Sequence, residues 1–471
     1  MKAATGRTEM TRAEWRQAIL AETRNPEGPG GDLLWAPELD AGTPERLRQI
    51  QDRKLPRAVA WMYDRSALFR SKCDAIGLEP GDVRGVDDLA GLPITRKEEM
   101  SADLEANPPY GTFQSLTDSE WLEHGWQVFQ TSGTTGAPRA FRYSQFDREL
   151  WSWNNARALY AMGIRGGHDV VLLCFGYGPH VFMWGMHYAL NLMGVPIVPG
   201  GVDSKTRAQM IQRYGVTTLF ATPSYLLYLA DVMRQQGLDP ASSAVERVVT
   251  GGEPVPVTTQ QRIAAAWGAK VHQCYGCTEA APSCGGYTCG AGDWLHFMDD
   301  THILETVDPE TMQPVRDGES GLSVVTNLFS DSSPQIRFLV GDYTRLTHEP
   351  CNCGRTHVRA LEGFSGRADD MLNVRGVTLF PSAIEHLVRG RVELGAEFEI
   401  VLATRGGLDE IELVVEAAPS VPASDYESVG RSLADAFRAR LELRPSVSVV
   451  APDTLPKTEF KAKRVRDERV S

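Results

Sequence analysis

The stretch between residues 143 and 273 most constrains the fold, because signals for strands and helices alternate along it. Val170–Phe175 is a continuous apolar run, which is typical of a strand buried on both faces. We expect a helix over Val181–Leu192, and further strands over Val216–Ala221, Arg247–Thr250 and Ala269 or Lys270 to Cys274. This alternation predicts an α/β domain whose ligands bind at the carboxyl ends of parallel strands.

The flanking regions follow other patterns. A helical arm is expected at the start, with a helical region from Thr43 to about Ile76 that is broken near Pro56. Residues 295–345 are β-rich, with strands expected at His302–Glu305, Gly321–Asn327 and Gln335–Phe338. A smaller α+β unit begins near Gly366. Three capping boxes are predicted, at Thr11–Glu14, Thr95–Glu98 and Ser382–Glu385.

Composition excludes some classes of partner. The chain has 471 residues and a net charge of −13, which argues against nucleic acid or an anionic membrane as its main partner. An anionic substrate must therefore be attracted by local positive groups. No apolar run reaches transmembrane length, and the first residues have no apolar signal core. We expect a cytoplasmic protein.

The segment Phe129–Arg139 predicts a phosphate-binding loop. Its glycines allow close approach of the backbone, its hydroxyls can follow phosphate oxygens, and successive N–H groups can form an anion-binding concavity. Arg139 supplies positive charge. A P-loop NTPase is excluded because no Gly-Lys-Ser/Thr follows at the required spacing. A polar surface turn is the alternative interpretation of this segment alone.

Five motifs in one order carry a family resemblance. They are Thr131–Pro138, Tyr275–Glu279, Gly341-Asp342, Gly366–Asp370 and Leu455–Lys461. Together they resemble the adenylate-forming superfamily of acyl-CoA synthetases, adenylation domains and luciferases over nearly the whole chain. Three further stretches are similar to the phenylacetate–CoA ligase branch, namely Gly366–Glu385, Phe175–Gly178 and Cys351–Arg355.

The resemblance implies two half-reactions. A carboxylate attacks the α-phosphorus of ATP to give acyl-adenylate and pyrophosphate, and a thiol, usually that of coenzyme A, then displaces AMP. It also implies an N-terminal adenylation domain over residues 1–366, a hinge at 367–370 that includes Asp369, and a mobile C-terminal domain over 371–471. The expected fold class is thus α/β, with a β-rich subdomain and a small α+β C-terminal domain.

The resemblance assigns residues to ATP. The residues expected to bind the β- and γ-phosphates are Thr131, Ser132, Gly133, Thr134, Thr135, Gly136 and Arg139. Glu279 is expected to bind Mg²⁺ as a hard carboxylate, and Thr278 to bond the α-phosphate. Asp342 is expected to accept both ribose hydroxyls and Arg367 to reach ribose or phosphate. Gly252, Glu253 and Tyr275 are expected around the adenine, with Tyr275 alternatively against the acyl group or in the core.

The catalytic lysine and the acyl pocket follow from the same resemblance. Lys461 matches the lysine that bridges the substrate carboxylate and the α-phosphate, although Phe460 stands where glycine is usual. The acyl pocket is expected to use Tyr177, His180, Val181, Trp184, Gly251 and Gly276. Aromatic walls would suit a benzoate- or arylacetate-type acid.

Six of the eight cysteines lie between Cys274 and Cys353, which in a cytoplasmic protein favours a metal over disulfides. Cys73 and Cys174 are expected as core thiols. By resemblance, Cys289, His296, Cys351 and Cys353 would hold a structural Zn²⁺, with Cys284 or His302 as alternative ligands. Free thiols without metal remain the other interpretation.

The sequence leaves several alternatives open. The acyl acceptor is coenzyme A or, instead, a separate carrier-protein thiol or an amine. A non-catalytic nucleotide-binding protein is disfavoured because Glu279, Asp342, Arg367 and Lys461 are all present. A homodimer through the N-terminal helices is an expectation from the family only.

Overall fold

The computed structural model describes residues 9–131, 138–201, 203–375, 377–405, 408–441, 443–457 and 464–469. The chain divides into two compact units. Unit 1 consists of Met1–Asp169, Tyr177–Ile197 and Cys274–Gly363, and unit 2 of Val170–Gly176, Val198–Gln273 and Phe364–Ser471. Each unit is built from segments that are far apart in the sequence.

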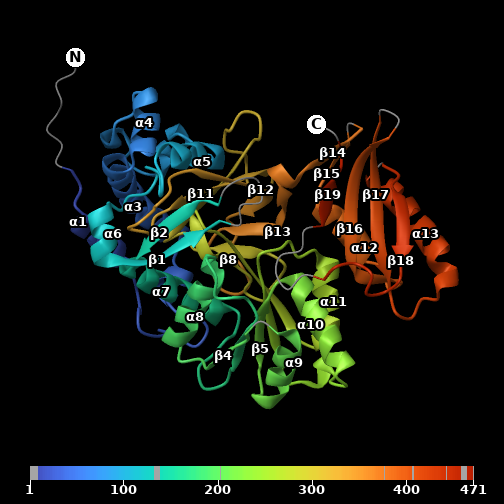
Figure 1. Cartoon of the computed structure of the whole chain (residues 1–471). Helices are drawn as coiled ribbons and strands as arrows, with labels where there is room; N and C mark the ends of the chain where they lie inside the picture. The colour runs from blue at the N-terminus through green and yellow to red at the C-terminus, as the bar shows by residue number, and fades with distance from the viewer. Residues whose placement is uncertain are drawn as a thin grey trace. The chain divides into compact units, whose positions relative to one another are not determined.

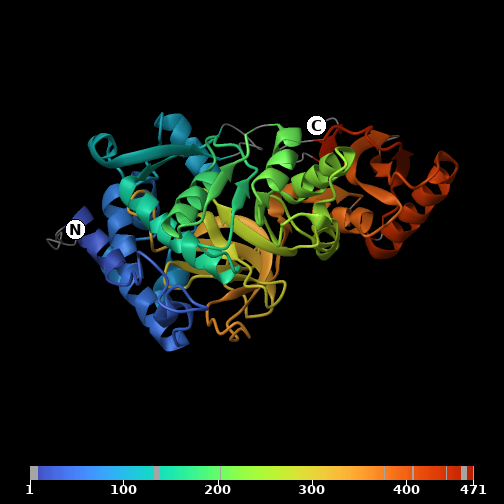
Figure 2. The same cartoon turned by 90° about the horizontal axis from the view of Figure 1, so that it is seen from below.

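Helices dominate the start of unit 1 and gather together in the blue part of Figure 2. They are α1 (Arg12–Leu20), α2 (Pro37–Asp40), α3 (Pro44–Arg65), α4 (Ala67–Ala75), α5 (Lys97–Ala106) and α6 (Asp118–His124), followed by α7 (Gln145–Ala161) and α8 (Val181–Leu192). The predicted helix over Val181–Leu192 is confirmed. No helix in the described ranges is both long and apolar enough to cross a membrane.

The structure corrects two helix predictions in this arm. The capping box at Thr11–Glu14 is confirmed, but the box predicted at Thr95–Glu98 is wrong: α5 begins at Lys97, and Glu99 accepts the backbone N–H of its N-cap, Arg96, at 2.7 Å. The predicted break near Pro56 is also wrong, because α3 continues through it. Burial of apolar residues such as Ile50 along α3 outweighs the cost of an internal proline, which is about 3 kcal/mol.

Two sheets complete unit 1. The antiparallel pair β1 (Gly125–Gln130) and β2 (Ala140–Ser144) flanks the predicted phosphate-binding segment. The strands of the larger sheet follow the order β10-β11-β12-β13-β9-β8-β7. Its strands are β7 (Lys270–Cys277), β8 (Ala281–Tyr287), β9 (Leu295–Phe297), β10 (His302–Val307), β11 (Ser320–Asn327), β12 (Phe338–Thr347) and β13 (Arg359–Arg367). The predicted β-rich region is confirmed, except that Gln335–Arg337 precede β12.

Unit 2 contains the predicted parallel α/β core (Figure 1). Its strand order is β7-β6-β5-β3-β4, with β3 (Val171–Leu173), β4 (Ile197–Pro199), β5 (Thr218–Ala221) and β6 (Arg247–Thr250). The helices are α9 (Ser204–Arg213), α10 (Pro223–Gln235) and α11 (Val257–Trp267). Leu219, Leu226 and Trp267 pack in one fully buried cluster between sheet and helices. Thr222 caps α10 and Pro223 begins it, as the sequence predicts.

The C-terminal part of unit 2 is a second α+β layer, orange to red in Figure 1. Its four-stranded sheet has the order β18-β17-β16-β19, with β16 (Leu394–Arg405), β17 (Leu408–Ala417), β18 (Ser446–Val450) and β19 (Val465–Asp467). The pair β14 (Leu372–Val374) and β15 (Val377–Leu379) precedes α12 (Pro381–Arg389), and α13 (Tyr426–Leu441) follows β17. The capping box predicted at Ser382–Glu385 is wrong, because Phe380 is the N-cap of α12 and Ser382 lies inside the helix.

A buried pair of carboxyl groups joins the helical arm to the rest of unit 1. Asp147 caps α7 together with Ser144 and accepts the backbone N–H of Asp331 at 3.0 Å. Asp331 in turn binds Arg12 and Arg16 of α1, at 2.8 and 2.5 Å. Burial, and then the neighbouring carboxylate of Asp331, raise the pKa of Asp147.

We predict that Asp147 makes the protein less stable as pH rises. A carboxyl whose pKa is raised on folding holds its proton longer in the native state, so the free energy of unfolding falls from about pH 4 up to the raised native value. The slope from one such proton is at most about 1.4 kcal/mol per pH unit. Asp147→Asn should remove this slope in urea unfolding measured from pH 4 to 8.

Glu310→Gln, at an exposed position, is the matched control and should keep the wild-type slope. An Asp147→Asn variant with the wild-type pH profile would contradict a raised pKa at this residue.

Candidate active site

Two hydrogen bonds join the ends of the predicted phosphate-binding segment. Thr131 donates its backbone N–H to the carbonyl of Arg139 at 3.1 Å, and the backbone N–H of Arg139 donates to Thr131 Oγ1 at 3.1 Å. Ser132, Gly133, Thr134, Thr135 and Gly136 lie outside the described residues. The β1–β2 ladder therefore fixes where this segment leaves and rejoins the sheet.

Arg139 and Glu279 form a buried ion pair across 140 residues of chain. The guanidinium Nη2 of Arg139 lies 2.6 Å from Glu279 Oε1, and the two side chains are only 12% and 9% exposed. Tyr143 in β2 also donates its hydroxyl to the carbonyl of Thr278 at 2.6 Å. The structure thus brings Thr278 and Glu279 to the end of the β1–β2 pair, where Thr131 follows β1 and Arg139 precedes β2.

Tyr275 and Asp342 form a second pair within unit 1. The hydroxyl of Tyr275, in β7, donates to Asp342 Oδ2, and the backbone N–H of Asp342 donates to Ser323 Oγ at 3.3 Å. Gly341 has φ +81°, a left-handed conformation that favours glycine and turns the chain just before Asp342. The sequence predicted Tyr275 beside the adenine, against the acyl group or in the core. It did not predict the hydrogen bond to Asp342, because the order of residues along the chain does not indicate this contact.

The remaining predicted nucleotide residues belong to unit 2. Gly251, Gly252 and Glu253 follow β6, and Gly252 has φ +81°. Glu253 Oε2 accepts the backbone N–H of Ser224, in the first turn of α10, at 3.2 Å. Arg367 ends β13 beside the short 3₁₀ helix that contains Asp369. Lys461 lies outside the described residues, so its predicted role remains a prediction.

Four of the predicted acyl-pocket residues of unit 1 lie at or just before the start of α8. Tyr177 and Trp184 pack edge to face, with ring centroids 5.1 Å apart, and Trp184 Nε1 donates to the carbonyl of Gly178 at 2.9 Å. Nδ1 of His180, the N-cap of α8, lies 3.2 Å from the carbonyl oxygen of Gln130. These bonds attach the start of α8 to the end of β1. Val181 is buried beside them, and Gly276 lies in β7.

His187 is a further member of this aromatic group that sequence reasoning missed. Its Nδ1 lies 2.9 Å from the hydroxyl of Tyr177, and burial lowers the pKa of its ring. It stands three residues after Trp184, and that helical spacing was a usable signal. A neutral imidazole and a phenol at this distance form a polar contact among aromatic rings.

A cluster of three cysteines and one histidine lies in the β-rich part of unit 1. The ligand atoms of Cys289, His296, Cys351 and Cys353 all lie within 4.8 Å of one another. The β9–β13 ladder, which pairs His296 with Arg359, brings this histidine to the loop before β13 that carries Cys351 and Cys353.

The geometry of this cluster fits one tetrahedral zinc. Two sulfurs at about 2.3 Å from zinc would lie about 3.8 Å apart, and a sulfur and a nitrogen about 3.6 Å apart. The Sγ atoms of Cys289 and Cys351 are separated by 3.8 Å, and Cys353 Sγ lies 3.6 Å from His296 Nε2. The donor set and both distances therefore suit a closed Cys₃His site.

The other thiols and the alternative ligands lie elsewhere. Cys284 Sγ is 3.0 Å from Cys274 Sγ, and His302 Nδ1 is 2.9 Å from Thr301 Oγ1. Cys73 and Cys174 are buried core thiols, as predicted, and burial raises the pKa of each to about 12. Among the described residues, the four-residue cluster is the one group with the geometry of a metal site.

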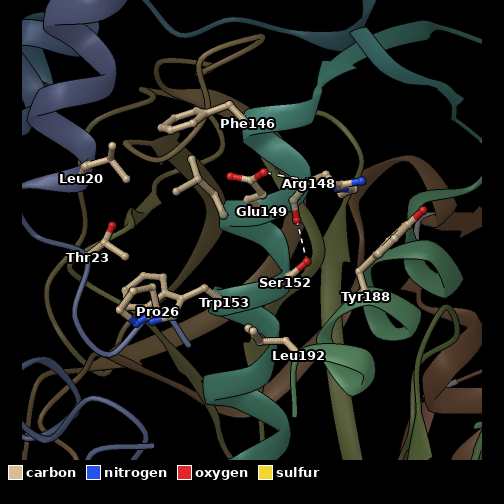
Figure 3. A pocket seen from close by; sticks show the side chains of 11 residues that line it. Leu20, Thr23, Pro26, Phe146, Arg148, Glu149, Ser152, Trp153, Tyr188 and Leu192 are labelled. Carbon is tan, nitrogen blue, oxygen red and sulfur yellow. Dashed lines mark hydrogen bonds and ion pairs between the residues drawn. The ribbon is translucent and has the colours of Figure 1, made fainter. Parts of the chain in front are cut away.

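A pocket of about 450 Å³ opens on another part of unit 1, between the end of α1 and the helices α7 and α8 (Figure 3). Trp153, Tyr188 and Leu192 form its apolar wall, and the charged residues Arg148 and Glu149 also line it. None of the predicted site residues lines it. It is therefore distinct from the predicted nucleotide and acyl groups.

Comparison with known proteins identifies the family. Residues 84–326 match the AMP-binding enzyme family, and residues 376–469 match the AMP-binding enzyme C-terminal domain. The chain belongs to the AMP-binding enzyme family. The predicted resemblance is thereby confirmed, as is the predicted class of enzyme, an AMP-forming acid–thiol ligase.

Several relatives are similar over most of the chain. A phenylacetate-coenzyme A ligase of Thermus thermophilus is 33% identical over 82% of this chain and 85% of its own. A phenylacetate-coenzyme A ligase of Escherichia coli is 30% identical over 92% of this chain and 97% of its own. The crystal structure of a 2-hydroxyisobutyryl-CoA ligase with a bound acyl-AMP superposes with a TM-score of 0.88 at 28% identity, covering 95% of this chain and 96% of that one.

We predict that Arg139 and Glu279 depend on each other for stability. Removing one partner leaves a buried charge uncompensated, which costs about 3–5 kcal/mol. Arg139→Ala should therefore destabilise the protein by that amount in urea unfolding. The double variant Arg139→Ala/Glu279→Gln should lose less than Arg139→Ala alone, because it leaves no unpaired carboxylate. Equal losses in both variants would contradict the coupling.

Proposed function

We propose that this enzyme is an ATP-dependent ligase that activates an aromatic carboxylate, of benzoate or arylacetate type, and transfers it to coenzyme A. The products would be the acyl-CoA, AMP and pyrophosphate. The observation that carries the proposal is the convergence of Arg139, Glu279 and Thr278 at the β1–β2 pair. The names of the relatives support the acid–CoA class.

Nucleotide binding would use the two buried pairs of unit 1. Arg139 offers a guanidinium for phosphate oxygens, and Glu279 offers a hard carboxylate for Mg²⁺. The cation, when bound, neutralises triphosphate charge. Asp342 would accept the ribose hydroxyls, and Tyr275 orients the carboxylate by its bond to Oδ2. Thr131 and the Ser132–Gly136 segment would surround the β- and γ-phosphates.

The chemical difficulty of the first half-reaction is that two anions must meet. A substrate carboxylate oxygen attacks the α-phosphorus, and the bond to pyrophosphate breaks. Catalysis must therefore come from positioning and from neutralisation of these charges. Because the chain carries a net charge of −13, local positive groups must supply that neutralisation. Lys461 would bridge the carboxylate and the α-phosphate. In the second half-reaction a thiol attacks the acyl carbon, and AMP leaves.

The aromatic group at the start of α8 supports an aryl acid. Tyr177 and Trp184 present ring surfaces, and His187 adds a polar contact. Such walls favour flat apolar substrates. The structurally similar 2-hydroxyisobutyryl-CoA ligase is named for a small aliphatic acid, so the size and shape of the acid are the point to test.

The test is a pyrophosphate-exchange screen over benzoates, arylacetates and 2-hydroxyisobutyrate, followed by thioester assays with coenzyme A. We expect exchange with an aryl acid. Exchange with 2-hydroxyisobutyrate alone would overturn the substrate class, and adenylation without CoA thioester would favour a carrier-protein thiol or an amine as acceptor. No exchange with any acid would overturn the proposal.

Lys461→Ala should lower exchange by about 10²–10³-fold while ATP binding persists, because it removes one positively charged partner of the reacting groups. Lys463→Ala removes the same charge two residues further along the chain and should retain exchange. Equal activity of the two variants would contradict the role proposed for Lys461.

We also propose that Cys289, His296, Cys351 and Cys353 bind a structural zinc ion. The sulfur–sulfur and sulfur–nitrogen distances of 3.8 and 3.6 Å support this assignment. A closed Cys₃His site leaves no ligand position for catalysis, so the ion would join the loop after β8 to the loop before β13.

We predict about one zinc per chain in elemental analysis of the purified protein. Cys353→Ser should lose most of this zinc and lower the Tm, because three ligands bind less tightly than four. Cys284→Ser removes a buried thiol outside the cluster and should retain the zinc. Full zinc content in Cys353→Ser, or none in the wild type, would contradict the site.

A further inference from the structure

Ser224, in the first turn of α10, is the centre of a polar network in unit 2. Its Oγ accepts from Nη2 of Arg389 at 3.0 Å and from Nη2 of Arg464 at 3.2 Å. Its backbone N–H donates to Glu253, which follows β6. One buried serine thus contacts helix α12, the residue before β19, and the predicted nucleotide loop.

Carboxylates compensate both arginines. Glu385 Oε1 lies 2.5 Å from Arg389 Nη1 and also accepts from Thr259 Oγ1 of α11 at 3.2 Å. Glu397 Oε2 lies 2.5 Å from Arg464 Nη1, with side-chain exposures of 8% and 12%. Buried charges at such positions need paired partners to be tolerated, and these have them. The network therefore imposes a definite arrangement on the residues that it joins.

Arg464 is also the first described residue after the segment 458–463, which carries Lys461. On the other side of that segment, the Lys457 ammonium lies 5.6 Å from the ring centroid of Tyr228. Tyr228 stands four residues after Ser224 in α10, and residues four apart share one face of a helix. Both residues that flank the segment are therefore held on the same face of α10, one turn apart.

A separate contact holds the turn between α12 and β16. Arg262 of α11 donates to the carbonyls of Arg391, Leu394 and Gly395, at 2.5, 2.8 and 3.0 Å. This contact supports the fold of the C-terminal part of unit 2 and involves neither Ser224 nor Arg464. The bonds of Arg464 are thus not needed to attach this turn.

We propose that Arg464 is a positioning residue for acyl-adenylate formation, acting through Ser224 and Glu397. It fixes the chain three residues beyond Lys461 to the turn of α10 that binds Glu253. In the sequence, Lys461 stands three residues before Arg464, and three residues span at most about 10 Å. The inference rests on the proposed function, in which Lys461 takes part in adenylation.

The test separates the two half-reactions. Acyl-AMP formation is followed by pyrophosphate exchange, and thioester formation is followed from supplied acyl-AMP and coenzyme A. Arg464→Ala should lower kcat for exchange by about 10²-fold with unchanged KM for ATP, because misplacement of a reacting group by about 1 Å costs that much. Thioester formation from supplied acyl-AMP should keep its rate.

Three variants sharpen the test. Arg464→Lys can keep an ion pair with Glu397 but cannot reproduce the forked bonds, so its exchange rate should lie between those of Arg464→Ala and the wild type. Ser224→Ala removes the shared acceptor and should lower exchange in the same direction. Arg466→Ala, the matched control, removes an exposed arginine that pairs with Glu399 and Glu468, and it should behave as the wild type.

The outcomes are distinguishable. If Lys461→Ala is inactive and Arg464→Ala exchanges at the wild-type rate, the positioning role is wrong and the proposed function stands. If Arg464→Ala loses both half-reactions equally and its Tm falls, the network is only structural. If Lys461→Ala exchanges at the wild-type rate, the proposed function fails, and the positioning role fails with it.

Discussion

Unit 1 depends on the buried ion pair between Arg139 and Glu279. It joins the β1–β2 hairpin to the segment after β7, and the hydroxyl of Tyr143 strengthens the same junction. A chain with a net charge of −13 that binds anionic substrates needs its positive groups where they act. Pairing with a buried carboxylate keeps the Arg139 guanidinium in one orientation.

A second set of buried charges organises the helical arm. Arg157 of α7 lies between Asp40 and Asp300, at 2.7 and 2.8 Å, and none of the three is more than 1% exposed as a side chain. His357 is buried near the same carboxylates. Burial lowers its pKa, but the carboxylates of Asp299 and Asp40, 3.8 and 3.9 Å from its ring nitrogens, outweigh that effect and raise the pKa to about 9. The arm is thus held to the β-rich region by specific pairs as well as by apolar packing.

Local signals predicted much of the fold. The cap-then-proline order at Thr222-Pro223 and the apolar strand Arg247–Thr250 gave correct elements, because neighbouring residues determine them. The box at Ser382–Glu385 was misleading, because Glu385 uses its carboxylate for Arg389 and Thr259. Pro56 was misleading because burial along α3, which sequence order does not reveal, outweighs its local cost.

The candidate site was predicted less completely. Resemblance supplied the residue types, including the Cys₃His set, and the geometry of that set fits the prediction. The partners of those residues were not foreseen: Tyr275 with Asp342, Arg139 with Glu279, and Ser224 with Arg464. Each pair joins positions at least 67 residues apart, so only the folded chain brings them together.

The Cys₃His cluster has a consequence for the order of folding. Cys289 and His296, in the loop after β8 and in β9, are more than 50 residues from Cys351 and Cys353, and the β9–β13 ladder brings the two pairs together. An ion that needs all four ligands can be bound tightly only after this long-range ladder has formed. Capture of the proposed zinc ion would then come late in the folding pathway, where it would slow unfolding more than it speeds folding.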